Sequence, residues 1–285
     1  MSWQPSPDWQ PLTAGIGQAT GGVWRTPGGE VVKRLVSGVT EPRHHAYWER
    51  QALVAESGVV ARTAGLRAPV CRGLERDADG ITLRMAHVAP YEWAPEALAE
   101  ALGRFSACSV PEPDWGARNV LRDRLRTVER RGGWAALGGL STPAIQALWA
   151  RRETALEVLD ALPRVPTHGD AHPANLLGRD GDDVIAIDWE QFGLGPAGFD
   201  LGYLLLGTDV PLDDLVAAHE AGASRTHHLP SAPPSGDVRG GAALVAAYTG
   251  VSRAAWALGR TGAGDHVERL GRLASIVDEA VSHAA

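Results

Sequence analysis

Cysteine is scarce in this chain of 285 residues, which contains only Cys71 and Cys108. Two cysteines cannot build a disulfide framework, and this usage is typical of proteins from a reducing compartment. The opening stretch MSWQPSPDWQ lacks a basic region followed by an apolar run, which argues against a secretory signal. No run of about eighteen apolar residues is present, so we expect no membrane-spanning helix and no membrane partner. The sequence therefore predicts a cytoplasmic protein.

Lysine is rarer still. Lys33 is the only lysine among the 27 basic residues, and the other 26 are arginines. In a chain that uses arginine almost wherever it needs a cation, a single lysine indicates a position that requires a compact ammonium. Chance would leave the same count, so the position of Lys33 has to decide between these interpretations.

The chain also lacks an excess of positive charge. Its net charge is −7, and residues 91–285 carry 17 basic against 26 acidic side chains, a balance of −9. A nucleic-acid partner would require a continuous surface of the opposite sign, so we expect none. An acidic half suits a cationic small substrate, although a merely solubilising surface would have the same composition.

The polar residues that suggest chemistry are concentrated in residues 167–206. In order, they are His168, Gly169, Asp170, Asn175, Asp188, Glu190 and Asp200. Asp170 and Asn175 fall in a loop, and the β-branched run at 184–187 predicts a short strand that ends at Asp188. A strand that ends in an acid, after a loop with a second acid and an asparagine, is typical of phosphoryl-transfer sites.

The pattern H-G-D-x-x-x-x-N, followed by I-D-W-E, resembles the aminoglycoside phosphotransferase and choline kinase group of the protein-kinase-like superfamily. Protein kinases carry Arg at the position of Gly169 and D-F-G at 188–190, so the small-molecule branch is the better match. The resemblance implies an α+β, bilobal fold. Residues 1–88 would form a nucleotide-binding lobe with a small antiparallel sheet and one helix, and residues 89–285 a larger, mainly helical lobe.

The same resemblance implies an ATP-dependent phosphotransferase that acts on a hydroxyl group. Asp170 would be the catalytic base, while Asn175 and Asp188 would hold Mg²⁺ against the nucleotide phosphates. His168 would orient the base, and Asp200 would tie the loop together.

The N-terminal part offers further nucleotide-binding candidates. A glycine-punctuated loop with Gly17, Gly21 and Gly22 precedes a strand that bears Lys33. The protein-kinase pattern G-x-G-x-x-G is not matched, so these glycines alone are weak evidence for a loop over the phosphates. A lysine-bearing strand at this distance strengthens the interpretation.

A helix is predicted from Thr40 to about Ser57, with Gly58 ending it. The resemblance implies that this helix supplies a glutamate to pair with the strand lysine, and we expect Glu49 in this role. Ala86 and Val88 lie in the expected connector between the lobes, where backbone groups would bind the nucleotide base.

The acceptor is predicted from charge together with the resemblance, which implies that the helices after the active-site stretch form the acceptor wall. Acidic residues lie there at Asp209, Asp213, Asp214 and Glu220, and further ones lie in the final predicted helix at Asp265, Glu268, Asp278 and Glu279. They suggest a cationic hydroxyl acceptor such as an aminoglycoside or a related basic antibiotic or metabolite.

Three kinds of alternative stay open. The acceptor could be choline or another amino alcohol, homoserine or a sugar. A kinase-like scaffold could bind nucleotide without turnover. Finally, alternation of His168, Asp170 and His172 resembles the H-x-D-x-H strand of a metal hydrolase, although further ligands at suitable spacing are not evident.

Overall fold

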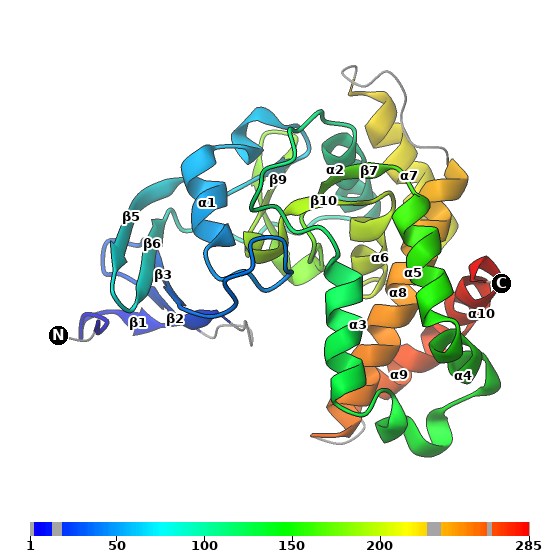
Figure 1. Ribbon diagram of the computed structural model, residues 1–285. Coiled ribbons are helices and arrows are strands. Elements are labelled where there is room, and N and C mark those ends of the chain that lie inside the picture. Colours follow the sequence, from blue (N-terminus) through cyan, green and yellow to red (C-terminus); the bar gives the residue numbers. More distant parts are fainter. Residues whose placement is uncertain (1–2, 13–18, 227–234, 261–263, 285) are drawn as a thin grey trace.

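The computed structural model describes residues 3–12, 19–226, 235–260 and 264–284, and it has two lobes (Figure 1). The first lobe is a five-stranded antiparallel sheet in the order β1-β2-β3-β6-β5 with one helix against it. Its strands are β1 (Gln10–Pro11), β2 (Thr20–Arg25), β3 (Val31–Val36), β5 (Cys71–Asp77) and β6 (Gly80–Met85). This arrangement confirms the small antiparallel sheet predicted for the N-terminal part.

Lys33 lies in the middle of this sheet. Its strand, β3, pairs with β2 on one side and β6 on the other, and Lys33 is opposite Val23 and Leu83. Val32 and Leu35 on the same strand are fully buried. A cation at the centre of a paired, β-branched strand needs partners close by, because burial alone disfavours its charge.

The helix of this lobe is shorter than predicted. Helix α1 spans Arg50–Ser57, whereas residues before Glu49 form successive turns. The Arg50 side chain explains the difference. Its guanidinium donates to the backbone carbonyls of Pro42, His44 and His45 at 2.6–2.9 Å, so these carbonyls have partners outside any helix. The predicted start at Thr40 was therefore wrong.

The second lobe is mainly helical. Its helices are α2 (Pro95–Ser106), α3 (Val120–Arg130), α4 (Pro143–Ala150), α5 (Arg152–Ala161), α6 (Phe199–Leu205), α7 (Leu212–Ser224), α8 (Ser235–Leu258), α9 (Gly264–Arg272) and α10 (Ala274–His283). Helices α6 and α8 pack together in the core, and α3 runs beside α8 (Figure 1). Helices α4 and α5 are separate and meet at Arg151.

Short strands and short 3₁₀ segments form the connections between these elements. A two-stranded sheet pairs β7 (Arg164–Thr167) with β10 (Gly193–Pro196), and a three-stranded sheet has the order β4-β9-β8. Its strands are β4 (Leu66–Arg67), β8 (Leu176–Asp180) and β9 (Asp183–Ala186), and the 3₁₀ turns are η1 (Val60–Arg62), η2 (Ala135–Leu140), η3 (Pro173–Asn175) and η4 (Trp189–Gln191). Strand β4 follows α1 in the chain but pairs in parallel with β9, so the two lobes share a sheet.

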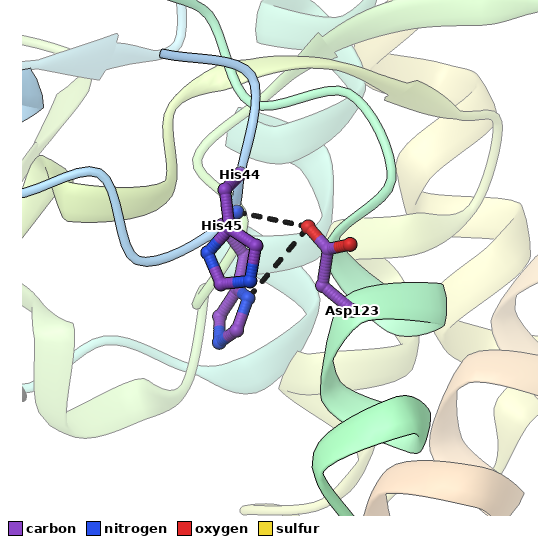
Figure 2. Close-up of side chains that lie close together, drawn as sticks. All are labelled: His44, His45 and Asp123. Carbon is purple, nitrogen blue, oxygen red and sulfur yellow. Dashed lines mark hydrogen bonds and ion pairs between the residues drawn. The ribbon is translucent and has the colours of Figure 1, made fainter. Parts of the chain in front are cut away.

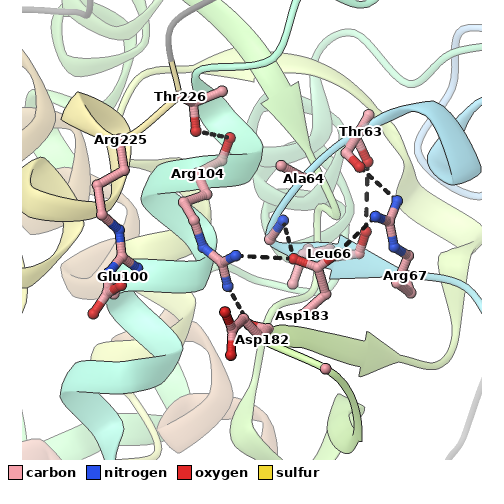
Figure 3. A network of polar contacts seen from close by, with 12 residues as sticks. Thr63, Ala64, Leu66, Arg67, Glu100, Arg104, Asp182, Asp183, Arg225 and Thr226 are labelled. Carbon is pink, nitrogen blue, oxygen red and sulfur yellow. Dashed lines mark hydrogen bonds and ion pairs between the residues drawn. The ribbon is translucent and has the colours of Figure 1, made fainter.

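Asp183 secures this shared region. Its carboxylate accepts from the Gly65 amide at 2.8 Å and from Arg104 of α2 at 3.0 Å, and it pairs with Arg67 at 2.7 Å (Figure 3). One partly buried carboxylate thus joins β4, β9 and α2. Within the described residues, no helix is both long and apolar enough to cross a bilayer.

Candidate active site

The loop that contains Asp170 is fixed by Asp200 and His168. Asp200, buried at the start of α6, accepts the backbone N–H groups of His168 at 2.7 Å and Gly169 at 2.9 Å. His168 Nε2 bonds the Ile187 carbonyl at 2.8 Å, and the Asp170 amide approaches His168 Nδ1 at 3.3 Å. Burial raises the pKa of Asp200, although these N–H groups favour its charged form. His168 and Asp200 thus hold the backbone on either side of Gly169 and next to Asp170, where they were predicted to orient the base and tie the loop.

Gly169 is required by the backbone at this point. Its φ is +84°, and a Cβ there would lie 2.4 Å from the carbonyl oxygen of Gln191. An L-residue at this φ is strained, and no side chain fits this contact. The loop therefore cannot accept the arginine that protein kinases have at the corresponding position.

Backbone pairing brings Asp188 next to Asn175 and Asp170. Asn175 Nδ2 donates to the Asp170 carbonyl at 2.9 Å and to Asp170 Oδ2 at 3.3 Å, which leaves the amide oxygen of Asn175 as a donor atom for a metal. The Ile187 amide bonds the Asn175 carbonyl at 2.8 Å, and Asp188 follows in the left-handed conformation with φ 65°. The three predicted residues thus lie together.

Lys33 faces Asp188 across the lobes. Its ammonium lies 2.7 Å from Asp188 Oδ1 and 2.8 Å from Glu190 Oε1. Burial opposes the charge of Lys33, but the two carboxylates outweigh burial and raise its pKa. The carboxyl group of Asp188 is only partly buried. Its burial opposes the charged form, yet the nearby ammonium lowers its pKa. Since one lysine faces two acids, this side of the site keeps an excess negative charge.

Glu190, and not Glu49, is the glutamate that Lys33 contacts in this structure. Glu190 also accepts a hydrogen bond from Thr20 Oγ1 at 3.0 Å. Glu49 stands just before α1, and its carboxylate accepts from the Tyr47 hydroxyl at 3.3 Å. The sequence contained a signal for Glu190, because it follows Asp188 by two residues and thus lies within reach of the same cation.

Packing explains why two of the three predicted glycines, Gly21 and Gly22, are glycine. Gly17 lies outside the described residues. A Cβ on Gly21 would come within 2.7 Å of Val36, and one on Gly22, with φ +152°, within 2.2 Å of the Trp24 ring. Both therefore have a structural reason to be glycine. A role in covering phosphates stays a prediction.

Ala86 and Val88 follow β6 into the second lobe. The Ala86 amide donates to the Val70 carbonyl at 2.9 Å, so only its carbonyl is left for a ligand. The Val88 side chain is buried against Gly178, where a Cβ would lie 2.3 Å from it. Their contact with a nucleotide base also stays a prediction.

A cavity of about 440 Å³ lies at the candidate site, and Asp170, Asn175, Asp188 and Glu190 line it. Its far wall comes from α3 and α8, which supply Arg124 and Arg253. Arg253 lies 3.3 Å and Arg124 3.9 Å from Asp170 Oδ1. Neither arginine was predicted to lie at the site, because nothing in the linear order marks helices separated by more than a hundred residues as neighbours.

The acids predicted to form the acceptor wall lie elsewhere. Asp209, Asp213, Asp214 and Glu220 are not among the residues that line the central cavity. Asp209 pairs with Arg272 and Asp213 with Arg239, at a separate cavity of about 740 Å³. The negative net charge of residues 91–285 therefore did not predict the charge of the central cavity.

The turn before α1 is tied to α3 by a cluster of His44, His45 and Asp123 (Figure 2). Asp123 Oδ2 accepts the His45 amide at 3.0 Å, and His44 Nδ1 accepts the Ala46 amide at 3.1 Å. Burial lowers the pKa of His45, which favours its neutral form. The composition is that of a metal site, but Asp123 Oδ2 and His44 Nδ1 already accept backbone bonds. We therefore assign it a structural role that fixes α3, and with it Arg124.

Comparison with known proteins agrees with this geometry. The model of the phosphotransferase enzyme family, APH, matches residues 10–233. A choline/ethanolamine kinase family protein from Mesorhizobium loti is 16% identical, with a TM-score of 0.61 over 97% of this chain and 92% of that one. No curated protein matches this chain.

Two antibiotic phosphotransferases are also similar in structure. Spectinomycin phosphotransferase APH(9)-Ia, in its AMP complex, is 14% identical with a TM-score of 0.57 over 95% of this chain and 92% of that one. APH(3'')-Id from Streptomyces rimosus, with ADP and streptomycin, is 19% identical with a TM-score of 0.53 over 86% and 92%. At these identities the likeness shows the kinase-like fold and leaves the acceptor open.

Proposed function

Because the chain belongs to the phosphotransferase enzyme family, we propose that it transfers the γ-phosphoryl group of ATP to a hydroxyl of a small molecule. The observation that supports this most is the meeting of Asp170, Asn175 and Asp188 at one cavity, with Lys33 bonded to Asp188. Each residue type at this place matches a requirement of phosphoryl transfer: a base, hard oxygen ligands and a cation for phosphate.

Asp170 accepts the acceptor's hydroxyl proton in this proposal. Its carboxylate is held by Asn175 Nδ2 and by Arg253, and the backbone of its loop is held by Asp200. A carboxylate fixed in this way orients the hydroxyl for in-line attack, which is the main contribution that a protein makes to this reaction.

Asp188 and the side-chain oxygen of Asn175 are the groups that would hold Mg²⁺. The Asp188 side chain is 34% exposed, and both groups line the cavity, so they fit a hard cation that enters with the nucleotide. The metal would neutralise charge on the phosphates. Lys33 would then exchange a carboxylate for a phosphate oxygen as its partner.

Spectinomycin phosphotransferase and the streptomycin complex of APH(3'')-Id take small molecules, and we propose a hydroxyl-bearing small molecule as the acceptor of this chain. A cationic acceptor, as surface charge suggested, has less support, since the acids that would bind it do not line the cavity. The free thiols of Cys71 and Cys108 are consistent with our proposal of a cytoplasmic enzyme.

A panel of hydroxyl-bearing antibiotics, amino alcohols, sugars and hydroxy acids, scored by Mg-ATP consumption, tests the proposal. We expect phosphorylated product with at least one member, and loss of that product in Asp170→Asn. Tight Mg-ATP binding without phosphoryl transfer to any acceptor or to water would favour the rival scaffold without turnover.

The metal-hydrolase alternative has little support. Both ring nitrogens of His168 already have partners in the Ile187 carbonyl and the Asp170 amide, and His172 Nδ1 accepts the Ala174 amide at 3.3 Å. Zinc-dependent hydrolysis that needs no ATP would nevertheless restore this alternative.

A further inference from the structure

We infer that the acceptor of this enzyme carries an oxyanion, a carboxylate or a phosphate group, and that Arg124 and Arg253 bind it beside the reacting hydroxyl. The inference rests on the proposed function, because it names the substrate class of the same site. It departs from the cationic acceptor that surface charge suggested.

The two guanidinium groups are arranged as a pair. Their central carbons lie 5.1 Å (Arg124) and 5.3 Å (Arg253) from the ring centroid of Tyr203, which is fully buried in α6. Arg124 also donates to Gln191 Oε1 at 2.7 Å. Cation–π contacts and this hydrogen bond restrict both side chains, so less conformational entropy is lost when an anion binds.

The charges of this pair are not balanced. Asp170 is the only carboxylate for which the structure records an ion pair with Arg124 or Arg253, so within the described residues two cations share one anion. Burial lowers the pKa of Arg124 to about 10. The attraction of Asp170 opposes this shift, and a smaller repulsion from Arg253 adds to it. A second anion between the guanidiniums would relieve this repulsion. A bound ammonium would increase it.

Other lining groups fit a hydroxylated acid. Thr249, one turn before Arg253 on α8, is buried, and its hydroxyl has no hydrogen-bond partner among the described residues. A polar ligand would satisfy it. Trp256 is 38% exposed on the same wall and offers an apolar surface. Arg131, also on this wall, adds a further exposed cation.

The nucleotide does not account for the pair. Lys33, Asp188 and Glu190 lie on the side of the cavity formed with the β-sheet lobe, where the phosphates and metal are proposed. Arg124 and Arg253 come from α3 and α8 of the other lobe and approach Asp170 from there. They are therefore placed against the group that supplies the hydroxyl.

Binding of sulfate to the protein saturated with Mg-ADP tests the inference, because the nucleotide occupies the phosphate-binding side. We expect Arg124→Gln and Arg253→Gln each to weaken sulfate binding by about 10- to 100-fold, the range for a charge-assisted hydrogen-bonded pair. Arg124→Lys, which keeps charge but loses the planar fork, should fall between wild type and Arg124→Gln.

Arg126→Gln is the matched control. Arg126 is exposed on the same helix, α3, and does not line the cavity, so its removal should leave sulfate affinity unchanged. Melting temperatures of all variants, measured without ligand, would identify any loss of folding. If Arg124→Gln or Arg253→Gln is unfolded, the milder variants Arg124→Lys and Arg253→Lys are compared with wild type for sulfate affinity instead.

Three sugars of one ring size but different charge provide a second measurement. Glucuronate should bind the Mg-ADP complex more tightly than glucose, and glucosamine least tightly. Absence of sulfate binding in wild type, equal sulfate affinity in all variants, or preference for glucosamine would each overturn the inference. If oxyanion binding holds while Asp170→Asn leaves ATP turnover unaffected, the proposed reaction fails but the oxyanion site stands.

Discussion

The two sides of the central cavity have opposite charge. On the side of the β-sheet lobe, one ammonium, Lys33, faces the carboxylates of Asp188 and Glu190. On the side of α3 and α8, the guanidiniums of Arg124 and Arg253 share Asp170. One side therefore has a net negative charge that a divalent cation would neutralise, and the other has a net positive charge that an anion would neutralise.

The difference shows that site charge follows from local partners and not from the composition of a lobe. The second lobe is acidic overall, yet its acids pair with arginines away from the cavity, as Asp213 does with Arg239. The cavity wall instead has two arginines that share one carboxylate, Asp170. Substitutions on each side should therefore affect different ligands.

The largest effect is expected on the negative side, from Asp188→Ala. The variant loses a carboxylate that would hold Mg²⁺ and that now bonds Lys33 at 2.7 Å. Turnover should fall by about 10³-fold or more, and Mg-ATP affinity should fall with it. Calorimetry with Mg-ATP measures the second effect. Unchanged Mg-ATP affinity would show that Asp188 does not have this role.

Asp170→Asn should have the next largest effect. Asparagine cannot accept the hydroxyl proton, so kcat should fall by about 10² or more. Mg-ATP affinity should stay near that of wild type, because Asp170 lies between the arginines and not against Lys33. Steady-state kinetics and nucleotide binding separate the two quantities. A variant with near-normal turnover would contradict the assignment of the base.

A smaller effect distinguishes the two candidate partners of Lys33. Glu190→Gln removes a carboxylate 2.8 Å from the ammonium and should raise the KM for ATP by roughly tenfold, the loss of about one charge-assisted hydrogen bond. Glu49→Gln is the matched control and should change this KM by less than about threefold. A larger increase of this KM in Glu49→Gln than in Glu190→Gln would mean that Lys33 changes partner when nucleotide binds.

The smallest effect on turnover is expected at His219, on α7 and outside the cavity. Burial lowers its pKa to about 4, against an ordinary value of about 6.5. Between these values the unfolded chain binds a proton that the folded chain does not, so stability falls as pH falls. The loss reaches about 3 kcal/mol near pH 4.

His219→Gln should flatten this part of the pH–stability curve and leave neutral-pH turnover unchanged. Denaturant titrations between pH 4 and 7 measure the difference between the two proteins. Curves that run parallel through this range would show that His219 is not the group responsible.

Much of the candidate site could be predicted from sequence because it is local. Asp170, Asn175 and Asp188 fall within twenty residues, and the β-branched run before Asp188 indicates a strand that follows the loop. The two-lobed α+β fold was predicted from the resemblance to small-molecule kinases, and the structure confirms it. Lys33 stood out because it is unique in composition and lies on a strand.

The positive side could not be predicted in this way. Arg124 and Arg253 become neighbours only when α3 and α8 pack, and 128 positions separate them. The start of α1 was misjudged for a related reason, since Arg50 binds carbonyls in a tertiary contact that outweighs the N-cap signal at Thr40. Long-range side-chain contacts leave no periodic pattern.

The uniqueness of Lys33 has a practical consequence. A lysine-specific endoprotease has one possible cut in this chain, which would leave pieces of 33 and 252 residues. Lys33 is 6% exposed and its strand is paired on both sides, so cleavage requires the sheet to open. The rate of this single cut therefore reports local opening of the sheet next to the cavity, and ligands that bind there should slow it.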